Sequence, residues 1–569
     1  MKDKKLFDSF SMKLFLMLSI YFLSILILYS ITSLININNI LGIIEIISII
    51  IPIIYVFTRN KDKKNYIAVI IFLFLVLVLP FLYNKTYDIT YDGNTYHKTA
   101  IAFIKNGYNP IHDNFLKFQE KNKDIIKVDK HSKNDIWVEH YPKATWIIAA
   151  TIYNLTGNIE SGKCITLILT LMLFILSYNT LIKILNRTWT LLLSILIIIN
   201  PIVMVQFFSY YVDGILGICF LIQLILLFYV NFSKKQDKDL WISIISSIVL
   251  LSNLKYTGLM CSGVISALFY FCYILKYRKD NRFLSNFKKI TMIFILTYFI
   301  AVGLVGANSY VKNTIDHKNP LYPIVGKDKI DIITNLQPKS YGEMSKFKKF
   351  TYSLFSKTEN TIYVMIKPTL KMPYRIYKSE FNELNIPDTR SAGFGPYFAF
   401  SLILSLIIFI PSLIIFIKNN RKNIHYPIIF ILSIIISIIL IGEAWWARYI
   451  PQFYYLVLGN IILGVYASKY VKFKKIYILI SFIPIITLII NASFLINIFG
   501  SKFKIFKSIN DDLNYMKTTS NLKIRLTDEA LIGYLYNLKD LNIKYTYINQ
   551  PTKNKIYRYA WQIQEVEDE

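Results

Sequence analysis

Residues 66–97 read YIAVIIFLFLVLVLPFLYNKTYDITYDGNTYH, and this stretch joins the two properties that decide the fold. Its first part, about residues 66–83, is an apolar run long enough to cross roughly 30 Å of hydrocarbon as a helix. Its second part places Asp88, Asp92 and His97 directly after that run. The stretch therefore predicts a membrane helix that delivers two carboxylates and an imidazole to a membrane surface.

The composition of the whole chain favours a membrane protein. Of its 569 residues, 54% are hydrophobic, and the mean hydropathy of +0.43 is higher than soluble proteins usually reach. The net charge of +29 suggests nucleic acid at first sight. The basic residues, however, cluster in short loops between apolar runs, as the positive-inside rule predicts. We therefore expect membrane lipids, and no nucleic acid, beside this charge.

Apolar runs recur along the chain and predict about 13 transmembrane helices. Strict alternation puts every short basic loop on one side, which we take as cytoplasmic together with the N-terminus. The loops 84–143 and 308–395 and the C-terminal residues then lie on the outer side. The predicted spans cover about residues 12–34, 40–57, 66–83, 163–185, 188–207, 214–231, 240–252, 258–275, 290–307, 397–417, 426–442, 451–468 and 476–497.

These patterns predict an all-α polytopic membrane protein with large outer-face loops and a small C-terminal α/β segment outside the membrane. The transmembrane domain covers residues 1–499, and the extracytoplasmic segment covers 500–569. Within that segment, Asn542–Tyr547 alternates polar and apolar residues and Asp528–Leu538 has a helical pattern. The sequence leaves open whether this segment caps a reaction centre or is a scaffold.

Acidic residues are almost absent from the apolar runs and gather at their outer ends, at Asp88, Asp92, Asp213 and Glu443. Transporters more often hold such residues near the bilayer midplane, so this distribution favours a reaction centre at the outer membrane surface. Asp92 is the first candidate for a general base in sugar transfer to a hydroxyl. Asp88 could assist it, hold a divalent cation or hydrogen-bond the donor. Alternatively, both cap a helix that we predict for Thr95–Lys105.

The histidines of the first outer loop do not identify a metal. His97, His112, His131 and His140 all lie in that loop, but their spacing matches no structural zinc site. The sequence therefore leaves the metal unknown, and a divalent cation is the one cofactor that it leaves open.

Two cations are predicted at other outer turns. Lys255 and Arg448 could neutralise a lipid-linked phosphate, Arg448 with a forked pair of donors. Their alternative role is to extend to the membrane interface, where Trp445, Trp446 and Tyr449 would form an aromatic belt.

Several of these features together resemble GT-C type, polyprenyl-phosphate-sugar-dependent glycosyltransferases of the dolichyl-phosphate-mannose mannosyltransferase kind. The segment Asp92-Gly93-Asn94-Thr95-Tyr96-His97 is similar to the D-[G/S]-x-x-Y-H segment of that family. The resemblance covers roughly residues 66–450. Its further motifs are Tyr141-Pro142, Asn200-Pro201 followed by Tyr211-Val212-Asp213-Gly214, the Lys255 turn, and Arg448-Tyr449 after a Trp-rich span end.

The resemblance implies a multi-spanning α-helical enzyme that moves a hexose or pentose from a polyprenyl-phosphate donor with inversion, with Asp92 as base. It implies a place in cell-surface glycan assembly, and we expect a bacterial cytoplasmic membrane. The acceptor could be a glycan, a polymer, a lipid or a protein. The expected substrate-binding residues are Tyr96, His97, Tyr141, Tyr211, Asp213, Lys255, Arg448 and Tyr449.

Two other functions remain open at this stage. A surface-polysaccharide polymerase or ligase would share the many spans and large outer loops, and would use Arg and His of the 308–395 loop rather than Asp92. A transporter or flippase would carry central charged residues and helices broken by Gly and Pro, of which the sequence has few.

Overall fold

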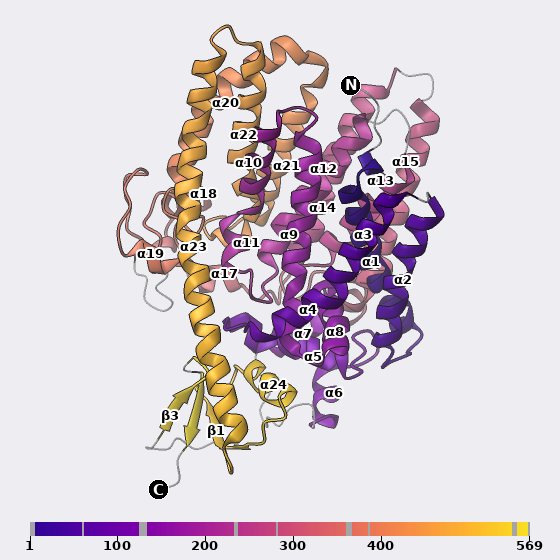
Figure 1. Ribbon diagram of the computed structural model, residues 1–569, viewed down its shortest axis with the longest axis vertical. Coiled ribbons are helices and arrows are strands. Elements are labelled where there is room, and N and C mark those ends of the chain that lie inside the picture. Colours follow the sequence, from indigo (N-terminus) through magenta and orange to yellow (C-terminus); the bar gives the residue numbers. More distant parts are fainter. Residues whose placement is uncertain are drawn as a thin grey trace.

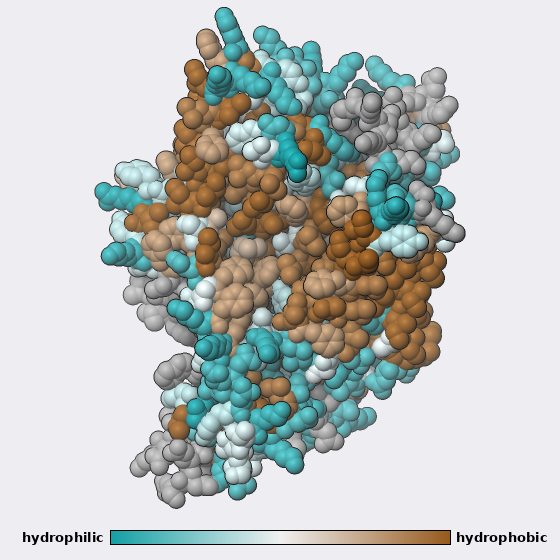
Figure 2. All heavy atoms as spheres, in the orientation of Figure 1, coloured by the Kyte–Doolittle hydropathy of each residue, from teal (hydrophilic) through white to brown (hydrophobic). Residues whose placement is uncertain are grey.

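The structure, a computed structural model, describes residues 6–59, 62–123, 134–232, 237–279, 283–359, 367–384, 387–548, 555–560 and 562–566. Helices dominate this part of the chain and run side by side along the long axis of the molecule (Figure 1). Figure 2 shows hydrophobic side chains in a broad band across the middle, with hydrophilic ones above and below it. The chain is therefore an all-α integral membrane protein in its main body.

Nine helical stretches of the described residues are long and apolar enough to cross a membrane, judged by length and composition. They are α1 (Phe10–Leu34); α2 (Leu41–Arg59); α3 (Lys63–Leu73) continued by η2 (Phe74–Val78), α4 (Leu79–Leu82) and η3 (Tyr83–Lys85); η5 (Ile159–Lys163) with α9 (Cys164–Leu181); α12 (Asp213–Phe232); α14 (Tyr256–Tyr277); α15 (Phe283–Tyr298) with η6 (Phe299–Leu304) and η7 (Val305–Asn308); α20 (Phe398–Asn420) with η9 (Arg421–Asn423); and α23 (Lys474–Thr518).

The nine stretches are fewer than the predicted count of about 13. The other four predicted spans also coincide with helices, but these are shorter: α10 (Arg187–Ile198), α13 (Lys238–Ser252), α21 (His425–Ile441) and α22 (Tyr454–Ala467). The α10 helix stops because Asn200 and Pro201 break it before α11 (Pro201–Val205). The Asn200 side chain accepts from the N–H of Ile202 and donates to Pro451 O at 2.9 Å, so it satisfies one backbone N–H and one carbonyl beside the break.

The two large outer loops contain short helices. Loop 84–143 forms a π-helical turn, η4 (Gly93–His97), followed by α5 (Lys98–Lys105), α6 (Phe115–Lys121) and α7 (Asp135–His140), and then leads into α8 (Ala144–Thr156). Loop 308–395 forms α16 (Tyr310–His317), α17 (Ile332–Asn335), η8 (Lys339–Tyr341), α18 (Lys346–Leu354) and α19 (Glu380–Glu383). The helix predicted for Thr95–Lys105 is thus η4 with α5, and Gly107 ends it with a φ of +93° that favours glycine.

The predicted topology puts certain helix ends on the same side of the membrane, and two pairs of these ends are in contact. Arg59 at the end of α2 pairs with Asp239 in the first turn of α13, with Nη2 2.9 Å from Oδ1. Lys13 of α1 is 3.6 Å from Asp62, whose side chain also accepts a backbone N–H at the start of α3. Side-chain caps of this kind satisfy amides that a helix start leaves unpaired.

The C-terminal residues form a small sheet with one helix. Its strands are β1 (Lys523–Leu526), β2 (Thr546–Tyr547), β3 (Lys555–Arg558) and β4 (Ile563–Val566), in the order β2-β1-β4-β3. The β1–β2 pair is parallel, with Lys523 opposite Thr546, and the other two pairs are antiparallel. Helix α24 (Gly533–Asp540) connects β1 and β2 and packs on loop 84–143. The predicted boundary at residue 499 falls inside α23, which runs unbroken into this unit (Figure 1).

Candidate functional site

Arg448 is the side chain on which the predicted site residues converge. It lies in η10 (Ala447–Tyr449), just after α21, and only 8% of its side chain is exposed. Its Nη2 is 3.1 Å from Asp92 Oδ2 and its Nε is 3.4 Å from Asp213 Oδ2, while Nη1 donates to Asp388 Oδ1. One guanidinium group therefore joins three carboxylates from three distant parts of the chain.

Asp213 also pairs with Lys255. Asp213 begins α12, Lys255 directly precedes α14, and Lys255 Nζ is 2.9 Å from Asp213 Oδ1. The side chains of Asp213 and Lys255 are 4% and 9% exposed. Lys255 and Arg448 are thus held inside the protein by carboxylates and do not extend to the membrane interface.

Aromatic rings surround both cations. The guanidinium carbon of Arg448 is 4.8 Å from the ring centre of Tyr211, 4.9 Å from that of Trp446 and 5.1 Å from that of Tyr449. Lys255 Nζ is 4.3 Å from the ring centre of Tyr449. Trp446 is fully buried and Trp445 nearly so, and their rings stack at 5.2 Å. These rings enclose the cations instead of forming a belt at the membrane surface.

Asp92 is the predicted catalytic carboxylate that remains partly open, with 19% of its side chain exposed. It precedes η4, but its side chain accepts no capping hydrogen bond there. Its Oδ2 instead accepts from the Tyr96 hydroxyl at 3.4 Å. Burial raises the pKa of Asp92, and the carboxylates of Asp388 and Asp213 act in the same direction, against the opposing effect of Arg448. A carboxylate in this state is better suited to accept a proton than an ordinary surface Asp.

His97 forms a neutral, polar part of the site wall. The indole N–H of Trp146 donates to His97 Nδ1 at 2.6 Å, so a neutral ring carries its proton on Nε2. Burial lowers the pKa of His97 to about 3, which keeps the ring uncharged. The ring centres of His97 and Tyr211 are 6.4 Å apart. The Tyr96 ring lies 6.4 Å from that of Tyr141, so all of these predicted residues share one cluster.

Asp88, the other predicted catalytic residue, lies apart from this cluster. It is fully buried, its Oδ1 accepts from the N–H and the hydroxyl of Thr90, and its Oδ2 accepts from the N–H of Tyr210 at 2.7 Å. A Cβ at Gly93 would lie 2.1 Å from Asp88 Oδ2, so the turn requires glycine there. Burial raises the pKa of Asp88. Its contacts fix the turn that presents Asp92.

A buried ionic cluster lies behind the same turn. Glu160 Oε1 is 2.6 Å from Lys98 Nζ, and Glu160 Oε2 is 2.6 Å from Lys163 Nζ. All three side chains are fully buried. Asn537 of α24 donates to Glu160 Oε1 at 2.9 Å and accepts from Lys98 Nζ at 3.0 Å. The C-terminal unit is thereby connected to the segment that carries Asp92.

The sequence pattern does not predict Asp388 as a site residue, nor Trp146 as the partner of His97. Asp388 lies in the predicted outer loop 308–395, but no local pattern separates it from the other acidic residues of that loop. Only its pairing with Arg448 does so.

Two other histidines of the first outer loop, His112 and His140, have hydrogen-bond partners within the protein. His140 Nδ1 lies 2.8 Å from Asn313 Oδ1, and His112 Nε2 lies 3.1 Å from Leu34 O. His131 lies outside the described residues. Within the part of the chain that the structure describes, no group of three or more His, Cys, Asp or Glu side chains could hold a metal ion.

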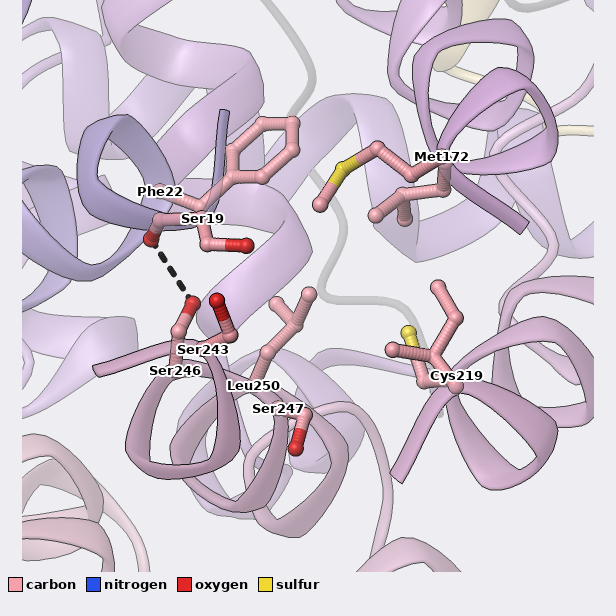
Figure 3. A pocket seen from close by; sticks show the side chains of 10 residues that line it. Ser19, Phe22, Met172, Cys219, Ser243, Ser246, Ser247 and Leu250 are labelled. Carbon is pink, nitrogen blue, oxygen red and sulfur yellow. Dashed lines mark hydrogen bonds between the residues drawn. The ribbon is translucent and has the colours of Figure 1, made fainter. Parts of the chain in front are cut away.

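A small cavity lies elsewhere, within the helix bundle between α1, α9, α12 and α13 (Figure 3). Ser243, Ser246 and Ser247 line it together with Met172 and Cys219, and its volume of about 10 Å³ is roughly that needed for one water molecule. The Ser246 hydroxyl donates to Ser19 O at 2.7 Å across its wall. The cavity is therefore too small for a substrate.

The sequence matches no family model and no curated protein.

Proposed function

We propose that the chain is a membrane glycosyltransferase that moves a sugar from a polyprenyl-phosphate donor to an extracytoplasmic acceptor with inversion, in cell-surface glycan assembly. The observation that supports this best is the convergence of Asp92, Asp213 and Asp388 on Arg448. It gathers residues of both large loops and of two helix starts around Asp92, whose side chain is partly open. The resemblance to the GT-C type supplies the reaction class.

In the proposed reaction, Asp92 accepts the proton of the acceptor hydroxyl as its oxygen bonds to the anomeric carbon. The bond between the anomeric carbon and the phosphate oxygen breaks on the opposite face, so the configuration inverts. The electron pair of that bond leaves with polyprenyl phosphate. Asp92 then releases the proton to water, and Tyr96 orients its Oδ2 between turnovers.

We further propose thirteen crossings, a cytoplasmic N-terminus, and a site and C-terminal unit on the outer side of a bacterial cytoplasmic membrane. The ion pair of Arg59 with Asp239 is consistent with one shared inner side for these two helix ends. The basic loops support the choice of that side as cytoplasmic.

The first test measures sugar release from a radiolabelled polyprenyl-phosphate sugar by membranes that carry the wild type or Asp92→Asn. The amide keeps the shape of the side chain and removes the base, so we expect roughly a hundredfold loss or more of transfer. Asp316→Asn is the matched control, because Asp316 is exposed in loop 308–395 and remote in sequence from the site residues. It should keep wild-type activity.

Equal transfer by the wild type and Asp92→Asn at equal expression would show that the base is another residue. Absence of transfer by the wild type from every polyprenyl-phosphate sugar would contradict the proposed function itself.

A further inference from the structure

The cations that the sequence suggested for phosphate binding are already neutralised by protein carboxylates. Arg448 and Lys255 supply two positive charges to the cluster, whereas Asp92, Asp213 and Asp388 supply three negative charges when ionised. The cluster as it stands would repel a phosphate group. An anionic ligand at this site needs a further cation nearby.

Arg390 is such a cation. It follows Asp388 by two residues and is 9% exposed. Its guanidinium carbon is 5.1 Å from the ring centre of Trp446, and that of Arg448 is 4.9 Å from the same ring centre. The two guanidinium carbons are therefore no more than about 10 Å apart, which is roughly one Debye length at 0.1 M ionic strength.

Arg390 also has unused hydrogen-bonding capacity. Its Nη1 donates to Leu336 O at 2.6 Å, which anchors one arm of the fork. Its Nε is buried without a partner, and none of the described carboxylates pairs with it. A buried guanidinium donor without an acceptor is unfavourable, so the position is well suited to an anion that supplies acceptor oxygens.

We infer that Arg390 binds the phosphate group of an anionic ligand at this site, next to the Arg448 cluster. The inference rests on the proposed function, and it adds to that function the residue that recognises the donor phosphate. The ligand oxygens would accept from Nε of Arg390, while Arg448 holds the carboxylates, including Asp92. Recognition of phosphate and positioning of the base are thus divided between two arginines stacked on one indole.

The test measures binding to the purified full-length protein of three probes: a C55 polyprenyl phosphate, the matching polyprenol and sodium phosphate. Arg390→Gln should weaken binding of the polyprenyl phosphate at least about tenfold, the effect of losing a hydrogen bond to a charged group. Binding of the polyprenol should not change. Arg390→Lys keeps the charge without the fork and should recover part of the affinity. Arg375→Gln, an exposed arginine of the same loop, is the matched control and should bind like the wild type.

The inference is overturned if Arg390→Gln binds polyprenyl phosphate like the wild type, if it loses both lipids equally, or if the wild type binds neither source of phosphate. Binding of sodium phosphate through Arg390, without binding of the lipid, would support phosphate recognition and contradict the lipid donor. Binding of polyprenyl phosphate through Arg390 by a protein that transfers no sugar would support the inference and contradict the transferase proposal.

Discussion

The guanidinium of Arg448 determines what each neighbouring carboxylate can do. Asp213 is buried and forms ion pairs with both Arg448 and Lys255, so its negative charge is balanced within the protein. Asp388 is the most exposed of the three, at 27%, and shares Arg448 with Asp92. Three carboxylates around one arginine raise the free energy of the fully ionised state. Asp92 thus combines partial exposure with an increased affinity for a proton.

The pH dependence of transfer should reflect Asp92. A base works only in its deprotonated form, so the rate should rise with pH as Asp92 loses its proton. Because burial raises the pKa of Asp92, this rise should lie above the ordinary value of 3.8. His97 should add no rise near its ordinary value of 6.5, because its pKa is lowered to about 3.

A profile of kcat/KM between about pH 4 and pH 8 tests this expectation. A profile that stays flat to the acid end would contradict the assignment of Asp92. A rise near neutrality that disappears in His97→Gln would instead assign the base to the histidine.

Among the elements, α24 packs on η4, the turn that directly follows Asp92, from outside the helix bundle. Asn537 connects Glu160 with Lys98, and a Cβ at Gly533 would be 2.5 Å from Asn94 Cα, so α24 lies directly on η4. The charges of Lys98 and Glu160 are fully buried and depend on this network. We therefore regard Asn537 as a positioning residue, which acts on Asp92 through the turn.

Asn537→Ala should lower kcat roughly tenfold, because a small displacement of a base slows the reaction, and should leave the KM for the donor within about twofold. Single-turnover and steady-state kinetics of the purified protein separate these constants. The control is Asn514→Ala, which removes an exposed amide of α23 and should behave like the wild type. A lower melting temperature with unchanged kcat would reduce Asn537 to a purely structural role.

The local pattern predicted some features of the site and not others, for a physical reason. Asp92, Asp213, Lys255 and Arg448 could be predicted because each lies near the end or the start of an apolar run, and a charge is unfavourable within the membrane itself. Asp388 could not, because its importance depends on a long-range contact. The division between Asp88 and Asp92 likewise depends on the turn at Gly93, which decides where each carboxylate points.

At the scale of the whole molecule, contacts at the site constrain the four short helices. Asp92, Asp213 and Asp388 share Arg448, and Lys255 pairs with Asp213. In the proposed topology, the chain returns through α10 after α9 to reach Asp213, and it returns through α13 after α12 to reach Lys255. By the same reasoning α21 returns the chain to Arg448 after α20. Helix α22 leads away from Arg448, so that α23 can bring the C-terminal unit back to Lys98.

A helix of 45 residues measures about 68 Å, more than twice the roughly 30 Å of a hydrocarbon core, so α23 can cross and still carry the C-terminal sheet beyond the membrane. The short helices pack among other helices, so less of their length has to face lipid. Where the helical hydrogen bonding stops beside them, side chains can pair with the exposed backbone groups, as Asn200 does after α10. These contacts support the proposed count of thirteen crossings, whereas length and composition identify nine candidate spans in the described residues.

Single cysteines at exposed positions test this count through the side on which each loop lies. The native Cys164, Cys219 and Cys261 are buried and Cys272 is half-buried in α14, so a background with all four replaced by Ser gives a clean signal. In intact cells, an impermeant maleimide should label Asp316→Cys, and Arg278→Cys should react only after permeabilisation. If the 15-residue α13 alone did not cross, Arg278→Cys would be labelled in intact cells and Asp316→Cys only after permeabilisation. Lys255 and Asp213 would then lie on opposite sides of the membrane, which a distance of 2.9 Å between their charged atoms forbids.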